Sequence, residues 1–141
     1  MSDEWAGALA AEEAAIYAYG LLGVRLSGDA VGEARAAEAA HRDRRDVLVS
    51  RLDQLKASAA PAPAGYELPF PVTGRDSALR LAAQVEDGVA AAWRAVLPVT
   101  RDGDRSTVLS ALVDSAVRAI RWRRLAGITP LTTAFPGRPA S

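Results

Sequence analysis

Hydrophobic residues recur every three or four positions along most of this chain, which is the spacing that places side chains on one face of an α-helix. The pattern covers four segments, at residues 3–26, 30–58, 74–98 and 105–126. It predicts an all-α fold in which four amphipathic helices form a single domain over residues 1–141. The residues expected to face the core are Trp5, Leu9, Ile16, Gly20 and Gly23; Ala34, Ala37, His41, Leu48, Leu52 and Leu55; Ala82, Val85, Val89, Trp93 and Val96; and Val108, Leu109, Leu112, Val113, Ala116 and Ile120.

A proline-rich segment separates the second and third predicted helices. The prolines between residues 60 and 71 exclude a helix there and favour an extended chain. At roughly 3 Å per residue, such a segment can run the whole length of a helix. We therefore predict an antiparallel four-helix bundle of ferritin-like type, which has one long crossover, rather than an up-down-up-down bundle.

Polar residues and glycines mark the other helix ends. Ser27 and Gly28 end the first helix, and Asp29 begins the second. The sequence Thr73-Gly74-Arg75-Asp76 fits a capping box at the start of the third helix. Gly127 ends the fourth helix, and the tail beyond it carries enough apolar residues to dock on the bundle.

The composition excludes several classes of function. Half of the residues are hydrophobic, only 6% are aromatic, and 17 basic residues balance 17 acidic ones. A neutral chain does not attract nucleic acid or an anionic membrane through its overall charge. The absence of cysteine excludes disulfides, thiolate metal sites and thiol catalysis. No run of apolar residues is long enough to cross a membrane, and the acidic start does not resemble a signal peptide, so we expect a cytoplasmic protein.

Ferritin-like bundles can hold two metal ions, and part of the required ligand pattern is present. That pattern takes a Glu from each of two helices and a Glu-x-x-His motif from each of the other two, because iron and manganese prefer carboxylate oxygens beside imidazole. The candidate metal ligands are Glu12, Glu13, Glu38, His41 and Glu86.

The fourth helix makes this ligand set incomplete. It offers only Asp114, which falls outside the apolar face, and Val117 stands where a His is needed. His41 lies close to the middle of its own apolar face, so we expect it inside the bundle. Buried carboxylates need partners, and ion pairs can supply them without a metal, so a metal-free polar network is the favoured interpretation.

Two arginine-rich segments have simple explanations. The alternating charges of residues 42–46 are typical of a solvated helix face. Arg121, Arg123 and Arg124 lie in the last turn of the fourth helix, where the helix dipole favours cations, although they could also bind an acidic partner. Tyr17 and Tyr19 flank the apolar face of the first helix and mark an edge of the core or a dimer interface.

Several segments resemble an actinobacterial ferritin-like family of unknown function, domain of unknown function 4439. The segments that carry the resemblance lie at residues 9–12, 16–20, 41–46, 66–69, 86–87, 119–123 and 134–137. The positions that match the family are Glu12, His41, Arg45, Glu86 and Trp122, whereas the family often has His where this chain has Glu13 and does not require Glu38. The resemblance implies a fold but no reaction.

Three hypotheses about function follow. In the first, the chain is a non-enzymatic or degenerate ferritin-like domain without a cofactor, a homodimer whose Glu12, His41, Arg45 and Glu86 form a buried polar cluster. In the second, the candidate ligands form a reduced iron or manganese site for oxidation or peroxide chemistry. In the third, the arginine-rich end of the fourth helix binds an acidic protein.

Overall fold

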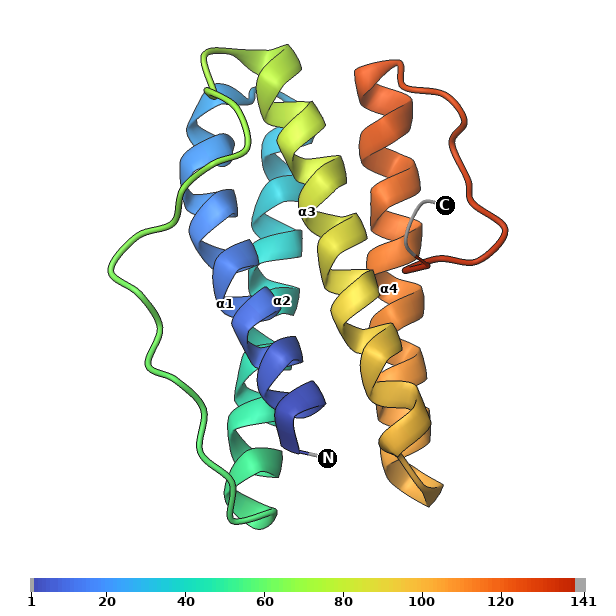
Figure 1. Cartoon of the computed structure of the whole chain (residues 1–141). Helices are drawn as coiled ribbons and strands as arrows, with labels where there is room; N and C mark the ends of the chain where they lie inside the picture. Colours follow the sequence, from blue (N-terminus) through green and yellow to red (C-terminus); the bar gives the residue numbers. More distant parts are fainter. Residues whose placement is uncertain (1, 139–141) are drawn as a thin grey trace.

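Four long helices build the computed structural model, which describes residues 2–138 (Figure 1). The elements are α1 (Ser2–Leu22), η1 (Gly23–Arg25), α2 (Asp29–Gln54), α3 (Arg75–Val96), η2 (Leu97–Val99) and α4 (Asp102–Ala126). The predicted all-α four-helix bundle is confirmed. No helix within residues 2–138 combines the length and the apolar character that crossing a bilayer requires.

The connection between α2 and α3 determines the topology. Helices α2 and α3 run in the same direction, and residues 57–73, which have no regular secondary structure, return along the whole bundle beside α1 (Figure 1). Helix α1 packs against both α2 and α3, and α3 packs against α4. One long crossover between the second and third helices is the connectivity of ferritin-like bundles.

Helix boundaries differ from the prediction by a few residues. Helix α1 ends at Leu22 and continues as the short η1 turn, and α4 begins at Asp102, three residues before the predicted start. Helix α2 ends at Gln54 because Lys56 adopts a left-handed conformation with φ of 54°. The N–H of Ala57 then bonds to the carbonyl of Leu52 at 2.9 Å, which closes the last turn.

The start of α3 is capped by a different residue from the predicted one. The N-cap is Gly74, not Thr73, and the acidic residue at position 76 does not complete a capping box. Instead, the Ser77 hydroxyl accepts hydrogen bonds from the backbone N–H groups of Thr73 at 2.9 Å and Gly74 at 3.2 Å. At the other end of the bundle, Gly127 ends α4 as predicted, with a left-handed φ of 71° that favours glycine.

The core-facing sides of α2 and α3 are largely as predicted, whereas those of α1 and α4 are not. On α1, Gly20 is exposed and Ile16 is only partly buried, and the buried row instead contains Glu12 and Tyr19. The apolar pattern placed Trp5 and Leu9 correctly but failed in the second half of the helix, because two polar side chains are inside. Three predicted core residues, Leu55, Leu109 and Val113, are between 39% and 50% exposed.

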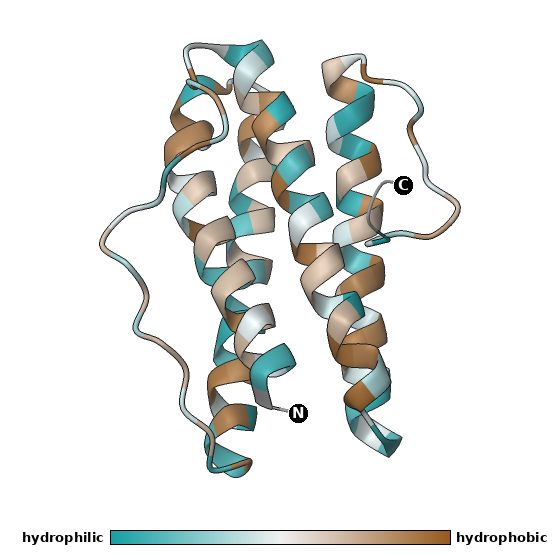
Figure 2. Ribbon diagram, in the orientation of Figure 1, coloured by the Kyte–Doolittle hydropathy of each residue, from teal (hydrophilic) through white to brown (hydrophobic). Residues whose placement is uncertain are grey.

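Half of the residues that α4 buries are small. The buried residues of α4 are Val108, Ala111, Leu112, Ser115, Ala119 and Trp122. Larger apolar residues of this helix, including Leu109, Val113 and Val117, remain partly exposed, and Figure 2 shows hydrophobic residues along its lower half. Small buried side chains allow the backbones of α3 and α4 to approach closely, so size as well as hydropathy selects the inner face.

The tail after α4 docks on the bundle, as predicted. The side chain of Arg94 donates to the carbonyl of Pro136 at 3.1 Å, and Arg123 donates to that of Leu131 at 3.2 Å. Gly137, with φ of 79°, lies so close to α3 that a Cβ there would sit 2.7 Å from the carbonyl oxygen of Ala90. The tail therefore follows α3 and α4 as part of the domain.

The core consists of two apolar clusters, one towards each end of the bundle. Trp5, Leu48 and Trp93 belong to the first cluster, and Leu22 and Trp122 to the second. Glu12, His41 and Glu86 are buried but belong to neither cluster. A polar layer thus occupies the middle of the bundle, between the two apolar clusters.

We predict that Ser77→Ala lowers the free energy of unfolding by about 1 kcal/mol, because two backbone N–H groups at the start of α3 lose their acceptor. Urea denaturation followed by circular dichroism measures this change. Ser106→Ala is the matched control, since Ser106 is exposed on α4. Equal stability of the two variants would show that the Ser77 cap contributes nothing.

Candidate functional site

His41 on α2 is the centre of the polar layer. Its Nδ1 lies 2.5 Å from Oε2 of Glu12 on α1, and its Nε2 lies 2.8 Å from Oε2 of Glu86 on α3. Carboxylates only accept hydrogen bonds, so a ring that serves both of them donates from both nitrogens and is protonated. The imidazolium therefore joins three helices.

The Glu12 carboxylate has a donor for each oxygen. Oε2 faces His41, and Oε1 accepts a hydrogen bond of 2.7 Å from the indole N–H of Trp93 on α3. The indole group can only donate, so it is matched to a carboxylate. Glu12 is 1% exposed, and Trp93 is completely buried.

The Glu86 carboxylate is likewise saturated with donors. The Tyr19 hydroxyl donates to its Oε2 at 2.8 Å, the same oxygen that faces His41. Arg118 on α4 reaches Oε1 with a guanidinium N–H at 3.2 Å. Both oxygens of a carboxylate that is 0% exposed are thus hydrogen-bonded.

Trp122 extends the network to the far side of the bundle. Its indole N–H donates to the Tyr19 hydroxyl at 2.8 Å, and the Tyr19 ring stacks on His41 with 5.5 Å between ring centroids. The seven side chains from all four helices form what we call the Glu–His–Glu network: Glu12, Tyr19, His41, Glu86, Trp93, Arg118 and Trp122.

Helical spacing explains how the chain assembles this network. Glu12 and Tyr19 are seven residues apart on α1, and Glu86 and Trp93 are seven apart on α3. Seven residues make nearly two full turns, so the two members of each pair lie on one face, stacked along the axis. Each of these helices therefore presents one carboxylate and one aromatic donor to the interior.

The surroundings of His41 favour its charged form. Burial by itself would lower the pKa of His41, but hydrogen bonds to Glu12 and Glu86, together with their negative charges, raise it to about 9. Burial raises the pKa of Glu86, but this effect is outweighed by the hydrogen bond and charge of His41 and by the charge of Arg118, so that the pKa lies below its usual value. Burial and the charge of Glu86 hold the pKa of Tyr19 well above its usual value, so the hydroxyl remains a donor.

The charges of the network balance. Two carboxylates face one imidazolium and one guanidinium, and Arg118, at 16% side-chain exposure, is the charged member nearest to solvent. Ionised groups in the interior cost several kcal/mol each unless they are paired and hydrogen-bonded. The arrangement meets that requirement from the chain's own side chains.

The structure corrects the predicted composition of the cluster. It brings together Glu12, His41 and Glu86 but leaves out Arg45, which pairs with Asp46 at 3.0 Å on the outside of α2. The cation in the cluster is Arg118 of α4 instead. Arg45 lies four residues after His41 on the same helix. The cation that faces Glu86 comes from α4, and spacing within α2 does not reveal contacts with another helix.

The predicted metal ligands do not converge. Glu13 lines a surface cavity, and Glu38 pairs with Arg42 at 3.0 Å on the surface of α2. The two remaining carboxylates occupy opposite nitrogens of one imidazole ring, so they cannot bind the same ion together with it. Within residues 2–138, no group of three or more His, Asp or Glu side chains is arranged to hold a metal ion.

The other predicted features lie at the surface. Asp114 accepts a hydrogen bond of 2.6 Å from Arg44, which ties α4 to α2. At the end of α4, Arg123 is engaged with Asp87 and with the tail, while Arg121 and Arg124 are exposed. Tyr19 is not part of a dimer interface, because it is 2% exposed within a single chain.

Sequence reasoning missed the roles of Tyr19 and Arg118. The signal for Tyr19 was its distance of seven residues from Glu12. Arg118 lies four residues before the buried Trp122, on the same face of α4. Neither spacing has meaning until the positions of the other helices are known.

Comparisons with other proteins agree with this fold. Residues 5–140 match the family model described as Domain of unknown function (DUF4439). The crystal structure of a conserved hypothetical protein from Mycobacterium tuberculosis is similar, with 38% sequence identity, a TM-score of 0.85 and 96% of each chain covered. No curated protein matches the chain.

We predict that His41 stays protonated through neutral pH and titrates near 9. Because the pKa of His41 is higher in the folded chain, protonated His41 stabilises the fold fully below pH 6.5. This contribution to the free energy of unfolding disappears as the pH rises from 6.5 to 9. Glu86, with its lowered pKa, stabilises the fold above about 4.5 and loses that effect at lower pH. The combined contribution of His41 and Glu86 to the stability should therefore be greatest between about pH 4.5 and 6.5.

The chain contains one histidine, so nitrogen NMR of the imidazole reports on His41 without assignment by mutation. Urea denaturation across the same pH range measures the stability, and His41→Gln should remove the decline between pH 6.5 and 9. An imidazole that is neutral at pH 7 would contradict the protonated assignment.

We predict that Glu86→Gln lowers the free energy of unfolding by about 3–5 kcal/mol, because His41 and Arg118 remain buried with one anion fewer. The amide also has one acceptor oxygen instead of two, so an N–H group then faces either Arg118 or the pair of Tyr19 and His41. Glu38→Gln is the matched control, since it removes only a surface ion pair worth about 0.5 kcal/mol. Chemical denaturation of both variants gives the comparison, and similar losses would show that the network does not stabilise the bundle.

Proposed function

Since the chain belongs to the family described as Domain of unknown function (DUF4439), the site itself must indicate the function, and we propose a non-catalytic helical domain that binds its ligand at the surface. In this proposal the Glu–His–Glu network is structural. The observation that carries it is that both nitrogens of His41 are occupied by carboxylates that are at most 1% exposed.

A general acid or base must reach a proton of its substrate within hydrogen-bonding distance. His41, Glu12 and Glu86 are each at most 1% exposed, so none of them meets a dissolved substrate in this conformation. The raised pKa of His41, about 9, also favours a permanent cation over a proton carrier near neutral pH. A fixed ion pair that holds four helices in register accounts for all of these properties.

The connectivity supports a degenerate ferritin-like origin. The single long crossover between α2 and α3 matches such bundles, and the interior position of two glutamates and a histidine matches where their metal ligands lie. In this chain an imidazolium takes the central position, and Arg118 supplies a second positive charge. These cations neutralise the carboxylates in the way that metal ions would.

The finer expectations from the sequence stay predictions. We predict that the protein is cytoplasmic and that it forms a homodimer. The row formed by Leu109, Val113 and Val117 on α4, each between 42% and 50% exposed, supports a contact with another chain but does not identify it.

Metal analysis of protein purified without a histidine tag separates a structural network from an iron or manganese site. We expect less than stoichiometric metal, and no increase in melting temperature when Mn²⁺ or Fe²⁺ is added under anaerobic conditions, because the carboxylates already have hydrogen-bonding partners. As a control, the same measurement is made on Glu12→Gln, whose melting temperature should likewise not rise when Mn²⁺ or Fe²⁺ is added. Stoichiometric metal that is lost in His41→Ala would overturn the metal-free network and favour the competing hypothesis of an iron or manganese site.

A further inference from the structure

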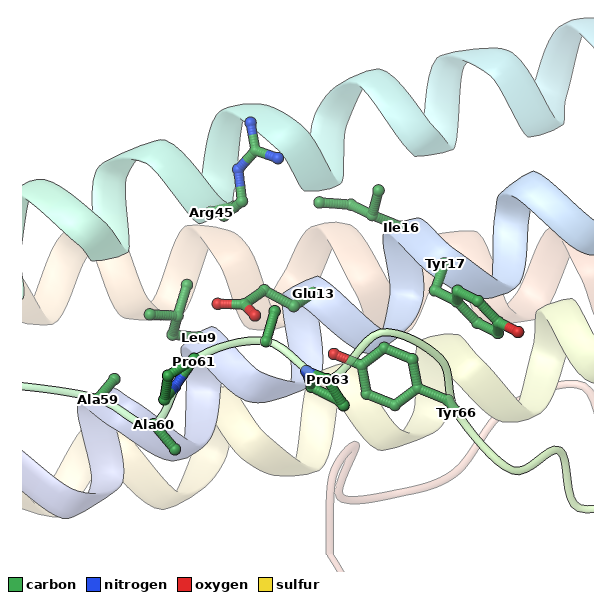
Figure 3. A pocket seen from close by; sticks show the side chains of 11 residues that line it. Leu9, Glu13, Ile16, Tyr17, Arg45, Ala59, Ala60, Pro61, Pro63 and Tyr66 are labelled. Atoms are coloured by element: carbon green, nitrogen blue, oxygen red, sulfur yellow. The ribbon is translucent and has the colours of Figure 1, made fainter.

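A cavity lies between α1 and the crossover, on the outside of the bundle (Figure 3). It has a volume of about 540 Å³, within the range of roughly 300–1,000 Å³ that is usual for small-molecule sites. Helix α1 contributes one wall with Leu9, Glu13, Ile16 and Tyr17, and residues 59–63 and Tyr66 of the crossover contribute the other. The cavity is separate from the Glu–His–Glu network, none of whose members lines it.

The walls are mainly apolar. Leu9 and Ile16 of α1 and the crossover prolines at 61 and 63 line the cavity, and Arg45 lies on its side towards α2 (Figure 3). A second hollow of about 470 Å³ lies against the same part of the crossover and reaches Ala6 and Ala10. The crossover thus stands off from α1 instead of packing tightly on it.

Glu13 is the exception in this apolar surrounding. Its carboxylate lines both hollows, yet among residues 2–138 no hydrogen bond or ion pair engages it. Arg45, the cation in the cavity wall, pairs with Asp46, and its guanidinium points away from Glu13 in Figure 3. A partly buried carboxylate with no cation of its own is complementary to a positively charged ligand.

Two tyrosines line the same cavity. The rings of Tyr17 and Tyr66 have centroids 5.2 Å apart and planes inclined by 53°. In Figure 3 the Tyr66 hydroxyl points to the side of the cavity that holds Glu13, and burial followed by the charge of Glu13 raises the pKa of Tyr66. Aromatic faces attract cations through their quadrupole, most strongly when the cation is partly desolvated.

We infer that this cavity binds a small organic ammonium compound, with its cationic group against Glu13 and the tyrosines and its apolar body against Leu9, Ile16 and the prolines. An anionic ligand would be repelled by Glu13. A neutral apolar ligand would cover the carboxylate without pairing it, which costs free energy. The inference rests on the proposed surface-binding function and gives it a ligand class.

The test uses three probes that share one ring and differ in charge: benzylammonium, benzyl alcohol and benzoate. Titration of the uniformly nitrogen-15-labelled full chain, followed by amide NMR shifts, gives the affinity and the location for each probe. Benzylammonium should bind most tightly and benzoate most weakly, with shifts in residues 9–17 and 59–66. Equal binding of benzylammonium and benzyl alcohol, preferential binding of benzoate, or no saturable binding of benzylammonium would overturn the inference.

Variants locate the charge that recognises the probe. Glu13→Gln should weaken benzylammonium binding about tenfold and leave benzyl alcohol unaffected, since only the charge is removed. Tyr66→Ala should weaken benzylammonium binding as well, through the lost ring. Glu33→Gln is the matched control, because it removes the same charge from a partly buried position on α2 that does not line the cavity. If Glu13→Gln and Glu33→Gln have equal effects, the inference is wrong.

The two proposals fail in different ways. Glu13 takes no part in the hydrogen bonds of His41, so a negative result with the ammonium probe leaves the structural role of the network untouched. Conversely, stoichiometric metal at His41 would refute the metal-free structural network without changing the result of the probe titration.

Discussion

The ion pairs on either side of His41 are the constraint on which the rest of this bundle depends. Two carboxylates lie in an interior that excludes water, where each would cost several kcal/mol if it had no partner. A single imidazolium serves both, and Trp93, Tyr19 and Arg118 supply the remaining donors. Because the partners come from four different helices, a shift of any one helix along its axis breaks hydrogen bonds that water cannot replace.

This constraint also explains where the large aromatic residues lie. The chain has three tryptophans, and two of them donate their indole N–H to the network, Trp93 to Glu12 and Trp122 to Tyr19. Their rings belong to the apolar clusters on either side of the polar layer. Each tryptophan thus joins an apolar cluster to the polar layer, so the core is continuous although its centre is ionic.

The interior and the surface therefore have different chemistry. Inside, every charge of the network has a partner within the chain, which leaves no group available for an outside molecule. At the surface, the crossover stands away from α1 and leaves a cavity in which Glu13 pairs with no cation of residues 2–138. The crossover is required because α2 and α3 run in the same direction, so the cavity is a consequence of the topology (Figure 1).

The helices, the crossover and part of the polar layer follow from the order of residues along the chain. Apolar spacing of three or four residues and the prolines of the crossover act locally, so they predict four helices and the extended connection correctly. His41 and Glu86 were expected inside because each lies near the apolar face of its own helix. The partners that meet them depend on how the helices pack. Arg45 was the predicted cation of the cluster, but the packing of α4 against α3 brings Arg118 to Glu86 and leaves Arg45 outside. The inner face of α1 was misread for the same reason, since Glu12 and Tyr19 are stable in the core only when donors and acceptors from other helices surround them.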